Sequence, residues 1–372
     1  MKEVIREMKM INVFGSKIGK EELAEIKSSL DNQWMGIGPK TAIFEKMMAN
    51  KLGLKDFIAT DNCSNALYMA VKLLNLPKGS HVIVPTINWV SGAIAVQLAG
   101  CKPIFADCDY DTINVTHTTI NKARTNRTKA IMIMHYGGLP VERLDYNVPI
   151  IADCAHAVDS AIDGNPLWLI GDIAVFSFNS IKNVACGELG GICSIHDSYS
   201  ARAKDMRYCG LVKSGLQAST DKDRWWEYEL KEPFIKALPN DVACSIGIAQ
   251  LNKLDKLQAR RKQIWDIYQE QLTDIGWIIS PSEIPKNIKH SYFTYFIKVV
   301  NGKRDVLARY LLDNGIYTTM RYEPLHLYKQ FGSKQKLPVA ERLNEELLNL
   351  PLHPNLTDLD VEYIIDKLLH FN

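Results

Sequence analysis

Short apolar runs alternate with helix-length segments between residues 57 and 195 of the chain. Several of these runs are nearly continuous in Ile, Val, Phe and Ala, which is typical of strands buried on both faces of a sheet. The runs cover residues 57–60, 81–86, 102–108, 129–136, 149–154, 173–178 and 190–195, and helical segments at 64–76 and 89–100 separate the first three. This alternation predicts an α/β fold whose mainly parallel sheet carries helices on both sides.

A second pattern begins near residue 241. One long helical segment is expected from there to about residue 273, followed by a strand at 291–300, a helix at 303–315 and a closing segment at 361–371. We therefore expect an N-terminal arm and a large domain over residues 1–245, and a smaller α+β domain over residues 246–372. The long helix joins the two domains, because no low-complexity linker separates the patterns.

Composition narrows the class of protein. The 372 residues are 47% hydrophobic, enough for one large core beside a second domain. Both signs of charge are interspersed and the net charge is +2, so we expect neither a nucleic acid nor a membrane partner. The N-terminal segment lacks the apolar core of a signal peptide, and no stretch approaches the roughly 20 apolar residues that span a bilayer. We expect a cytoplasmic protein.

Eight cysteines are scattered along the chain without CxxC or zinc-like spacing, so no metal site is expected. Cys101, Cys108, Cys154 and Cys193 lie in predicted strands or at their ends, where a free thiol packs as a small apolar side chain. This usage is typical of a reduced cytosolic protein.

Lys182 follows an aromatic strand and precedes a glycine cluster, in the segment FSFNSIKNVACGELGG (176–191). Most lysines are solvated surface charges, and such lysines commonly lie in loops. A lysine in an apolar pocket has a lowered pKa instead, so that more of it is the neutral amine that attacks an aldehyde. The residues that accompany Lys182 distinguish a solvated surface lysine from a buried reactive amine.

Polar residues at strand ends supply possible partners, because ligands of open α/β sheets bind at the carboxyl ends of strands. Asp153 either caps a turn or is a buried carboxylate that keeps a pyridine nitrogen protonated. Ser64 and Asn65 begin a helix, with Ser64 as an ordinary N-cap or both as part of an anion site. Ser177 offers a second hydroxyl on the strand face opposite its phenylalanine neighbours. Trp89 is either core or a ring that stacks on a planar cofactor.

The order of several segments resembles the DegT/DnrJ/EryC1/StrS family of sugar aminotransferases. The segments are NCSNAL (62–67), PTINWV (85–90), IADCAHA (151–157), GDIAVFSFNSIKNVACGELGG (171–191), LPNDVACSIGIAQL (238–251) and EPLHLY (323–328). The similarity extends from WMGIGPKTAIFEK (34–46) to LNLPLHPNLTDLDVEYII (348–365). It implies the aspartate-aminotransferase fold (type I) of enzymes that use pyridoxal 5′-phosphate (PLP), with a large mainly parallel-sheet domain and a smaller α+β domain.

The resemblance also implies roles for single residues. Lys182 matches the lysine that attaches to the cofactor aldehyde, and Asp153 matches the carboxylate that faces the pyridine nitrogen and makes the ring an electron sink. His156 matches a Gln or His position that lies against the ring near its phenolic oxygen. Ser64 and Ser177 match phosphate contacts, and Trp89 matches the aromatic residue that stacks on the ring.

Lys236 precedes LPND, where relatives carry an Asn or Lys that reaches the phosphate of the neighbouring subunit. The resemblance thus implies a homodimer with shared active sites. The chain departs from the family pattern at Cys63, which replaces a glycine, at Asn65, which replaces a small residue, and at GELGG, which replaces GEGG.

The implied reaction transfers an amino group from L-glutamate to a nucleotide-linked 3- or 4-keto-deoxysugar, with pyridoxamine 5′-phosphate as the intermediate cofactor form. One alternative is a sugar dehydratase of the same family, but these carry histidine in place of Lys182. Another is a cofactor-free binding or regulatory protein, which the joint presence of the lysine, the aspartate and both serines opposes. His326 and Arg321 either meet the sugar or its diphosphate or are surface groups on a loop. The nucleotide and the aminated carbon stay open.

Overall fold

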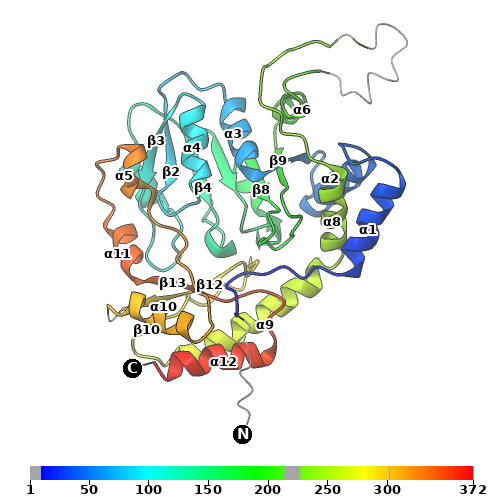
Figure 1. Ribbon diagram of the computed structural model, residues 1–372. Coiled ribbons are helices and arrows are strands. Elements are labelled where there is room, and N and C mark those ends of the chain that lie inside the picture. Colours follow the sequence, from blue (N-terminus) through cyan, green and yellow to red (C-terminus); the bar gives the residue numbers. More distant parts are fainter. Residues whose placement is uncertain (1–9, 213–225, 227, 301, 372) are drawn as a thin grey trace.

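The computed structural model describes residues 10–212, 226, 228–300 and 302–371 (Figure 1). The first nine residues, which belong to the segment expected not to be a signal peptide, lie outside the described residues. Within the described ranges, none of the helices combines the length and apolar character that crossing a membrane requires.

A seven-stranded sheet with the order β1-β9-β8-β5-β4-β2-β3 forms the centre of the large domain. Its strands are β1 (Ile58–Thr60), β2 (His81–Pro85), β3 (Lys102–Ala106), β4 (Thr128–Met134), β5 (Ile150–Asp153), β8 (Ile173–Ser177) and β9 (Gly190–Ser194). Each predicted apolar run forms one of these strands. Strands β8, β5, β4, β2 and β3 pair in parallel, whereas β9 is antiparallel to both β8 and β1. The predicted mainly parallel sheet is confirmed.

Helices cover both faces of this sheet. One face packs against α3 (Cys63–Leu73), α4 (Ser91–Leu98) and α6 (Asp197–Met206), and the other against α2 (Pro39–Leu52), α5 (His117–Ala123) and α8 (Asp241–Asn252). In β2, Val82 and Val84 face the first core and Ile83 faces the second, because successive side chains of a strand alternate. Helix α1 (Lys20–Asp31) lies outside this layer and packs along α8.

The small domain has its own antiparallel sheet, β10-β12-β13, and its own core. The strands are β10 (Ile278–Ile279), β12 (Tyr295–Val299) and β13 (Leu347–Leu350), and the helices that pack on them are α9 (Leu254–Leu272), α10 (Arg304–Asp313) and α12 (Asp358–Leu369). The predicted strand at 291–300 and helix at 303–315 correspond to β12 and α10. A smaller C-terminal α+β domain is therefore present, as expected.

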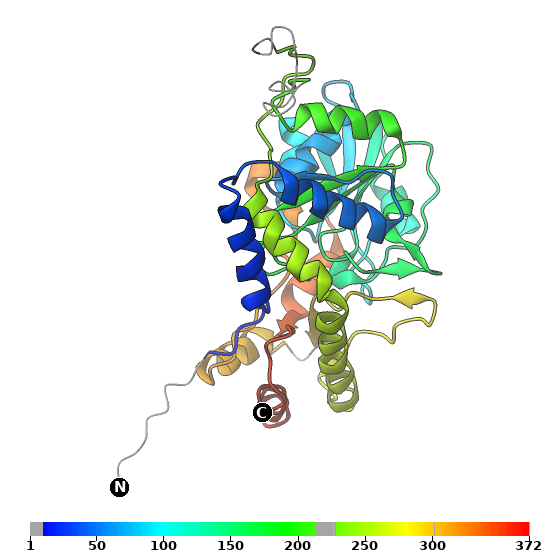
Figure 2. The same cartoon turned by 90° about the vertical axis from the view of Figure 1, so that its right-hand side faces the viewer.

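The prediction of one continuous helix from residue 241 to 273 was wrong. The segment is split at Lys253, whose backbone leaves the helical conformation (φ −111°, ψ 8°), and Figure 2 shows the change of direction between α8 and α9. Ala243 and Ile248 of α8 lie in the large-domain core, whereas Ile264 and Tyr268 of α9 lie in the small-domain core. The break lets each half turn its apolar side toward a different core.

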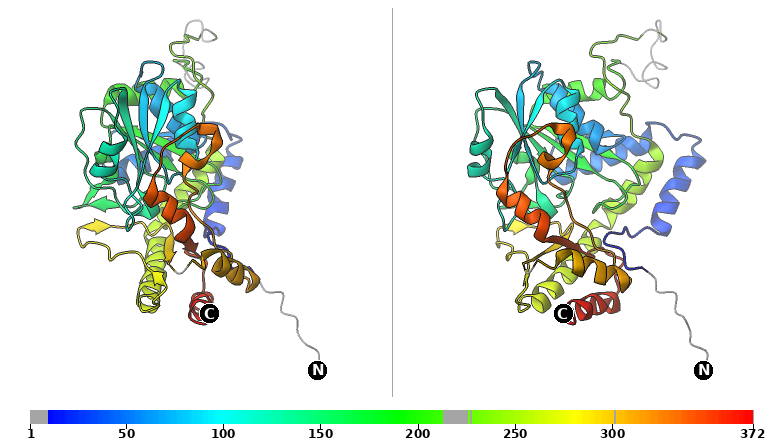
Figure 3. Two further views of the ribbon diagram at one scale, coloured as in Figure 1. Left: turned by 90° about the vertical axis from the view of Figure 1, so that its left-hand side faces the viewer. Right: turned by 60° about the vertical axis from the view of Figure 1, so that its left-hand side comes forward.

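Residues 319–346 return from the small domain to the large one (Figure 3). This segment contains η3 (Leu325–Leu327), η4 (Lys329–Phe331) and α11 (Pro338–Glu346). The Gln335 side chain pairs with the backbone of Phe105 in β3, at 3.0 and 2.8 Å, and Asp107 accepts a hydrogen bond from the Ala340 amide at 2.8 Å. These contacts hold the segment over the carboxyl ends of the parallel strands.

Short elements complete the described chain. A three-stranded sheet with the order β11-β6-β7 joins β6 (Ala161–Ile162) and β7 (Asn165–Pro166) to β11 (Ile288–Lys289). The short helix η1 (Tyr136–Gly138) lies between β4 and β5, and η2 (Leu167–Ile170) lies between β7 and β8. All eight cysteines are free, and the four predicted to be small core residues are buried in or beside β3, β5 and β9.

Candidate active site

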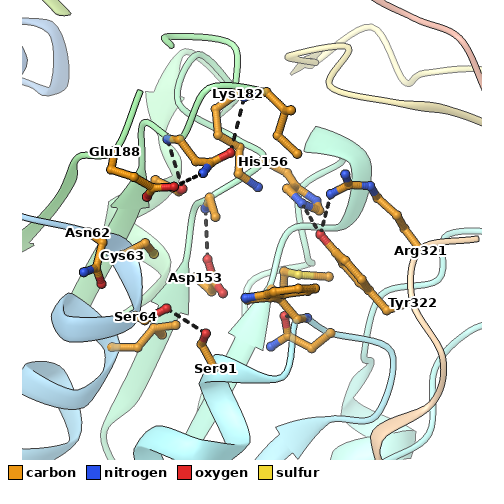
Figure 4. Close-up of a pocket in the computed structure, with 18 of the residues that line it drawn as sticks. Asn62, Cys63, Ser64, Ser91, Asp153, His156, Lys182, Glu188, Arg321 and Tyr322 are labelled. Carbon is orange, nitrogen blue, oxygen red and sulfur yellow. Dashed lines mark hydrogen bonds between the residues drawn. The ribbon is translucent and has the colours of Figure 1, made fainter. Parts of the chain in front are cut away.

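A cavity of about 560 Å³ lies at the carboxyl ends of the parallel strands, where residues 319–322 face the large domain (Figure 4). Seven of the predicted site residues line it together: Ser64, Trp89, Asp153, His156, Ser177, Lys182 and Arg321. The other three, Asn65, Lys236 and His326, are not among the lining residues. The cavity therefore brings together residues that are far apart in sequence.

Lys182 is buried, with 9% of its surface exposed, in the turn that follows β8. Its amine lies 4.6 Å from the centre of the Phe293 ring, which belongs to the small domain. The pKa of Lys182 is lowered to about 8, because burial and the nearby Arg321 cation lower it more than the Asp153 and Cys63 groups raise it. With a pKa near 8, roughly one amine in ten is neutral at pH 7. A solvated surface lysine does not fit this environment.

Asp153 is the last residue of β5 and is 3% exposed. Its Oδ1 accepts a hydrogen bond from the Ala155 amide at 3.0 Å, so it does cap the following turn. Burial raises the pKa of Asp153, while that hydrogen bond and the Lys182 charge lower it. The Ala155 bond is the one hydrogen bond to this carboxylate among the described residues, so the other oxygen is available to a cationic ligand.

Ser64 is not the N-cap of its helix. The Asn62 side chain caps α3 by accepting from the Asn65 amide at 2.8 Å, and the Ser64 hydroxyl pairs with that of Ser91 at 2.7 Å. Ser91 is the first residue of α4, so two helix N-termini meet at this hydroxyl pair (Figure 4). First-turn amides have no acceptor within their own helix, and such helix starts bind phosphate.

The glycine cluster after Lys182 shapes the same region. A Cβ at Gly190 would lie 2.3 Å from the carbonyl carbon of Asn62, because β9 passes directly against the start of α3. Leu189, the leucine of GELGG, is buried, and its carbonyl accepts a hydrogen bond from the Phe178 amide at 2.8 Å. This hydrogen bond continues the pairing of β8 with β9 beside the cavity.

Trp89 precedes α4 instead of opening it, and 58% of its surface is exposed, so it is not a core residue. Its ring lies 5.8 Å from that of Tyr322. Its neighbour Asn88 is buried and lines the cavity, and the Nδ2 group of Asn88 has no hydrogen-bond partner among the described residues. Both side chains are thus free to contact a ligand.

His156 stacks on Phe293, with 4.0 Å between the ring centres and 21° between the planes. Its Nδ1 accepts from the Gly137 amide at 3.3 Å, so the proton is on Nε2, which donates to the Tyr322 hydroxyl at 3.1 Å. Burial holds the pKa of His156 well below its usual range, and the Lys182 and Arg321 charges lower it further. The imidazole is therefore neutral.

Tyr322 accepts a second hydrogen bond from Arg321 Nη1 at 3.0 Å. Two donors on one phenol oxygen leave its own O–H to donate to a third group. Sequence reasoning missed Tyr322, Ser91, Asn88 and Phe293. Ser91 could have been predicted as a hydroxyl near an expected helix start, and Tyr322 as the neighbour of Arg321. No feature of the sequence points to Phe293.

Three predicted residues have other surroundings. Asn65 donates to both carboxylate oxygens of Asp61, at 3.0 and 2.8 Å, and its side chain does not line the cavity. His326 is buried between Thr86 Oγ1, at 2.7 Å, and Glu341 Oε1, at 3.3 Å, so it is neither a surface group nor a cavity residue. Lys236 is exposed and outside the cavity, and its reach to a neighbouring subunit stays a prediction.

The cavity has a complement for each group of a phosphorylated pyridine aldehyde. The Lys182 amine suits the aldehyde, the Asp153 carboxylate suits a ring nitrogen, and the Ser64–Ser91 pair suits the phosphate; Ser177 lines the same cavity. When bound, PLP supplies an electron sink for carbanions. Fold and cavity together define the class of PLP-dependent enzymes with the aspartate-aminotransferase fold.

Comparison with known proteins identifies the family. Residues 16–369 match the model of the DegT/DnrJ/EryC1/StrS aminotransferase family, and the chain belongs to this family. It is 32% identical over 368 residues to dTDP-4-dehydro-2,3,6-trideoxy-D-glucose 4-aminotransferase of Saccharopolyspora spinosa, covering 96% of both chains. It is 30% identical over 366 residues to the spore coat polysaccharide biosynthesis protein SpsC of Bacillus subtilis, covering 94% of both.

A solved structure agrees with this assignment. The aminotransferase TlmJ of Streptoalloteichus hindustanus superposes with a TM-score of 0.89 at 34% sequence identity, over 96% of this chain and 98% of that one. The protein is therefore a PLP-dependent transaminase.

Proposed function

We propose that this transaminase moves the amino group of L-glutamate to a nucleotide-linked 3- or 4-keto-deoxysugar. The observation that carries the proposal is the buried Lys182 amine, with its pKa near 8, beside a buried carboxylate. The named activity of the Saccharopolyspora relative, which acts on a dTDP-linked 4-keto sugar, supports this choice of acceptor.

The chain's own residues have distinct tasks in this proposal. Asp153 holds the ring nitrogen protonated, and the Ser64–Ser91 pair with Ser177 anchors the phosphate. Trp89, exposed on the cavity wall, stacks on the ring. Lys182, once its amine is released by the substrate, moves a proton between the substrate carbon and the cofactor, as the 1,3 shift of a transamination requires.

The dehydratase alternative needs a residue at position 182 that cannot anchor the cofactor. Lysine at this position, buried and with a depressed pKa, favours amine chemistry. A non-catalytic binding protein would not need to bury an amine and a carboxylate in one cavity at the cost of desolvating both. We therefore retain transamination.

Two half-reactions test the proposal. L-Glutamate alone should bleach the yellow purified enzyme and release one equivalent of 2-oxoglutarate per active site, and a screen of nucleotide-linked 3-keto and 4-keto sugars should restore the colour. Steady-state kinetics should be ping-pong, since donor and acceptor use the same site in turn. Intersecting double-reciprocal lines, or elimination of a hydroxyl without amination, would contradict the proposal.

We also propose a homodimer in which Lys236 of each subunit reaches the cofactor phosphate of the other. Lys236 is exposed and lies outside its own subunit's cavity, which is compatible with such a reach. Loss of a charge-assisted bond of about 1.5–3 kcal/mol should weaken cofactor binding roughly 10- to 100-fold in Lys236→Ala.

Subunit mixing tests that sharing. A heterodimer of Lys236→Ala and Lys182→Ala subunits has one site with both defects and one with neither, so activity should return after verified exchange. If the mixture shows only the summed activities of its parents, Lys236 serves its own subunit or none.

A further inference from the structure

We propose that a second cavity of this protein binds a nucleoside phosphate and that its occupation is sensed at Lys182. The cavity has a volume of about 750 Å³ and lies between α9 and β11, the yellow strand beside α9 in Figure 2. Among the described residues, none lines both this cavity and the active site. The inference therefore does not depend on which sugar the enzyme aminates.

His290 gives the second cavity a buried hydrogen-bond donor. The residue lines the cavity, and 4% of its surface is exposed. Its Nδ1 accepts from the Tyr292 amide at 2.9 Å, so the ring proton is on Nε2, and burial lowers the pKa of His290 to about 3, which keeps the imidazole neutral. No partner for this Nε2–H is found in the described part of the chain. An oxygen of a ligand in the cavity would satisfy it.

Lysine side chains add positive charge around this donor. Lys262, Lys286 and Lys289 all line the cavity and are exposed. Lys289 contacts the buried carboxylate of Asp159 at 2.9 Å, but Asp159 is also held by Lys51 at 2.5 Å, so two ammonium groups share one carboxylate. Lys286 forms no ion pair with any residue that the structure describes. Such compact cations suit a phosphate group.

The face of α9 over the cavity is acidic at one end and basic at the other. Asp255 is exposed and has no ion pair among the described residues, whereas Lys262 is held only by the exposed Asp266 of the next turn, at 2.6 Å. Two helical turns, about 10 Å, separate Asp255 from Lys262, which is comparable to the length of a ribose diphosphate. The other carboxylate on the rim, Asp163, accepts from the Asn287 amide at 3.1 Å. Sugar hydroxyls can donate to Asp255 while phosphates meet the lysines.

An aromatic ring completes the match to a nucleoside. Tyr292 lines the cavity and is half-buried. Its ring centre lies 4.8 Å from that of His290 and 5.6 Å from that of Trp265, so the ring is held in place by its neighbours. Any of the nucleic acid bases can pack on such a ring, because each has a π face.

The segment that carries His290 also reaches the active site. Phe293 follows three residues later, and the centre of its ring lies 4.6 Å from the Lys182 amine and 4.0 Å from the centre of the His156 ring. A ligand that displaces residues 290–292 therefore acts on the ring that borders the reactive amine.

Gln258 forms a second connection between the two cavities. It lines the second cavity, and its Oε1 accepts from Asn183 Nδ2 at 2.7 Å. Asn183 directly follows Lys182, and the side-chain amides of Gln258 and Asn183 both donate to the Ser291 carbonyl, at 2.8 and 2.5 Å. Because linkage between two sites is reciprocal, a ligand here should alter protonation at the Lys182 nitrogen.

Calorimetric titration of the PLP enzyme with UDP, dTDP and ADP tests the binding site. At least one nucleotide should show a binding component that Lys286→Gln and His290→Asn each weaken roughly 3- to 30-fold. Asparagine at position 290 keeps an acceptor for the Tyr292 amide but lacks the Nε2 donor. Lys256→Gln changes an exposed lysine of α9 that does not line the cavity, and this matched control should bind as the parent does. Pyrophosphate, without hydroxyls or a base, should bind at least about tenfold more weakly.

The colour of bound PLP gives the second readout, since its absorption changes with protonation at the Lys182 nitrogen. The nucleotide that binds should shift the pH midpoint of this change by a few tenths of a unit in the parent and in Lys256→Gln, but not in Lys286→Gln. A nucleotide in the active site would instead shift all three alike. The measurement uses neither glutamate nor a keto-sugar, so it is independent of the proposed transamination.

Four results would overturn the proposal. Absence of binding by all three nucleotides, or binding that neither cavity variant weakens, would exclude the site. Pyrophosphate binding as tight as that of the nucleotides would reduce it to a general anion site. Binding in the second cavity without a shift of the PLP midpoint would exclude the connection to Lys182. If His290→Asn lowers the unfolding temperature, the surface variant Lys286→Gln decides alone.

Discussion

The two walls of the cavity are built by different means. The large-domain wall consists of strand ends and helix starts. There Asp153 accepts a hydrogen bond from the Ala155 amide and the Ser64 hydroxyl pairs with that of Ser91, whereas Asn88 Nδ2 has no partner among the described residues. The wall from the small domain is a loop, residues 319–322, on which Arg321 has an unpaired nitrogen and no ion pair among the described residues. The first wall is built on regular secondary structure and the second on a loop.

The two walls therefore have different tasks: the large-domain wall carries the reacting groups, and the loop can determine which substrate is bound. The sheet fixes the positions of the amine and the carboxylate, so these positions are set by the same hydrogen bonds that form the fold. The loop can change its residues without disturbing the sheet, which is why substrate choice in α/β enzymes commonly lies in loops. Substitutions on the two walls should therefore fail in different ways.

The largest expected effect is at Lys182. Lys182→Ala should lower turnover roughly 10⁴-fold or more, because the residue both attaches the cofactor and moves the proton. The thermal unfolding temperature should stay within a few degrees of the parent, because the substitution removes a desolvated amine. A turnover near that of the parent would show that the large-domain wall does not carry the chemistry.

Asp153→Asn should rank second. The amide keeps the shape of the carboxylate but not its charge, so the protonated ring nitrogen loses its partner. We expect the activation barrier to rise by about 3–5 kcal/mol, which corresponds to a loss of roughly 10²- to 10⁴-fold in turnover. Single-turnover rates of both half-reactions should fall together. A change of only a fewfold would reduce Asp153 to the turn cap that its bond to Ala155 already shows.

The Lys182 amine predicts a pH dependence of cofactor attachment. With a pKa near 8, the protonated amine is unreactive, so the attachment rate of PLP to the cofactor-free protein should rise with pH up to about 8 and then level off. Below the pKa the rate should fall about tenfold per pH unit. Because the Arg321 charge lowers this pKa, Arg321→Gln should move the midpoint upward. A midpoint that is unchanged in this variant would mean that the two walls are not electrostatically coupled.

His326 tests how the loop wall is held. His326→Ala removes the bonds to Thr86 and Glu341 and should cost about 1–2 kcal/mol of unfolding free energy. The KM for substrate should rise several-fold with a smaller change in kcat, because the loop at residues 319–322 that lines the cavity is loosened. Lys329→Gln, an exposed position on the same segment, is the control. Loss of sugar binding at full stability would instead place His326 on the substrate.

Ser91→Ala should have the smallest effect. One hydroxyl of the pair at the phosphate end is lost, so cofactor affinity should fall about 3- to 10-fold, measured by equilibrium titration of the cofactor-free protein. Ser180→Ala, an exposed serine near Lys182 that does not line the cavity, should leave the affinity unchanged. Equal affinities for the two variants would remove Ser91 from the site.

The large-domain wall was also the more predictable of the two. Strand ends such as Asp153 can be located from apolar runs, and all seven strands were found this way, because buried parallel strands are continuously apolar. The predictions for the start of α3 were less accurate. Asn62, and not Ser64, caps the helix, and the Asn65 side chain donates to Asp61. Side-chain direction within a helical turn is decided by local hydrogen bonds that spacing does not reveal.

The loop wall could not be derived from pattern. The position of Phe293 under Lys182, and of His326 against Thr86, depends on how the two domains dock, and no periodicity encodes that. The break at Lys253 was missed for the same reason. Both halves of the segment are helical in pattern, and only the existence of two cores forces the turn between them.

The close approach of Gly190 to Asn62 has an evolutionary consequence. Gly190 does not line the cavity, yet only glycine fits there, because any Cβ would displace the backbone of Asn62, whose side chain caps α3. Libraries that randomise the cavity for new sugars should leave this position alone. We expect sequence variation to be tolerated in the cavity loop at residues 319–322 and not at Gly190, in a strand inside the sheet.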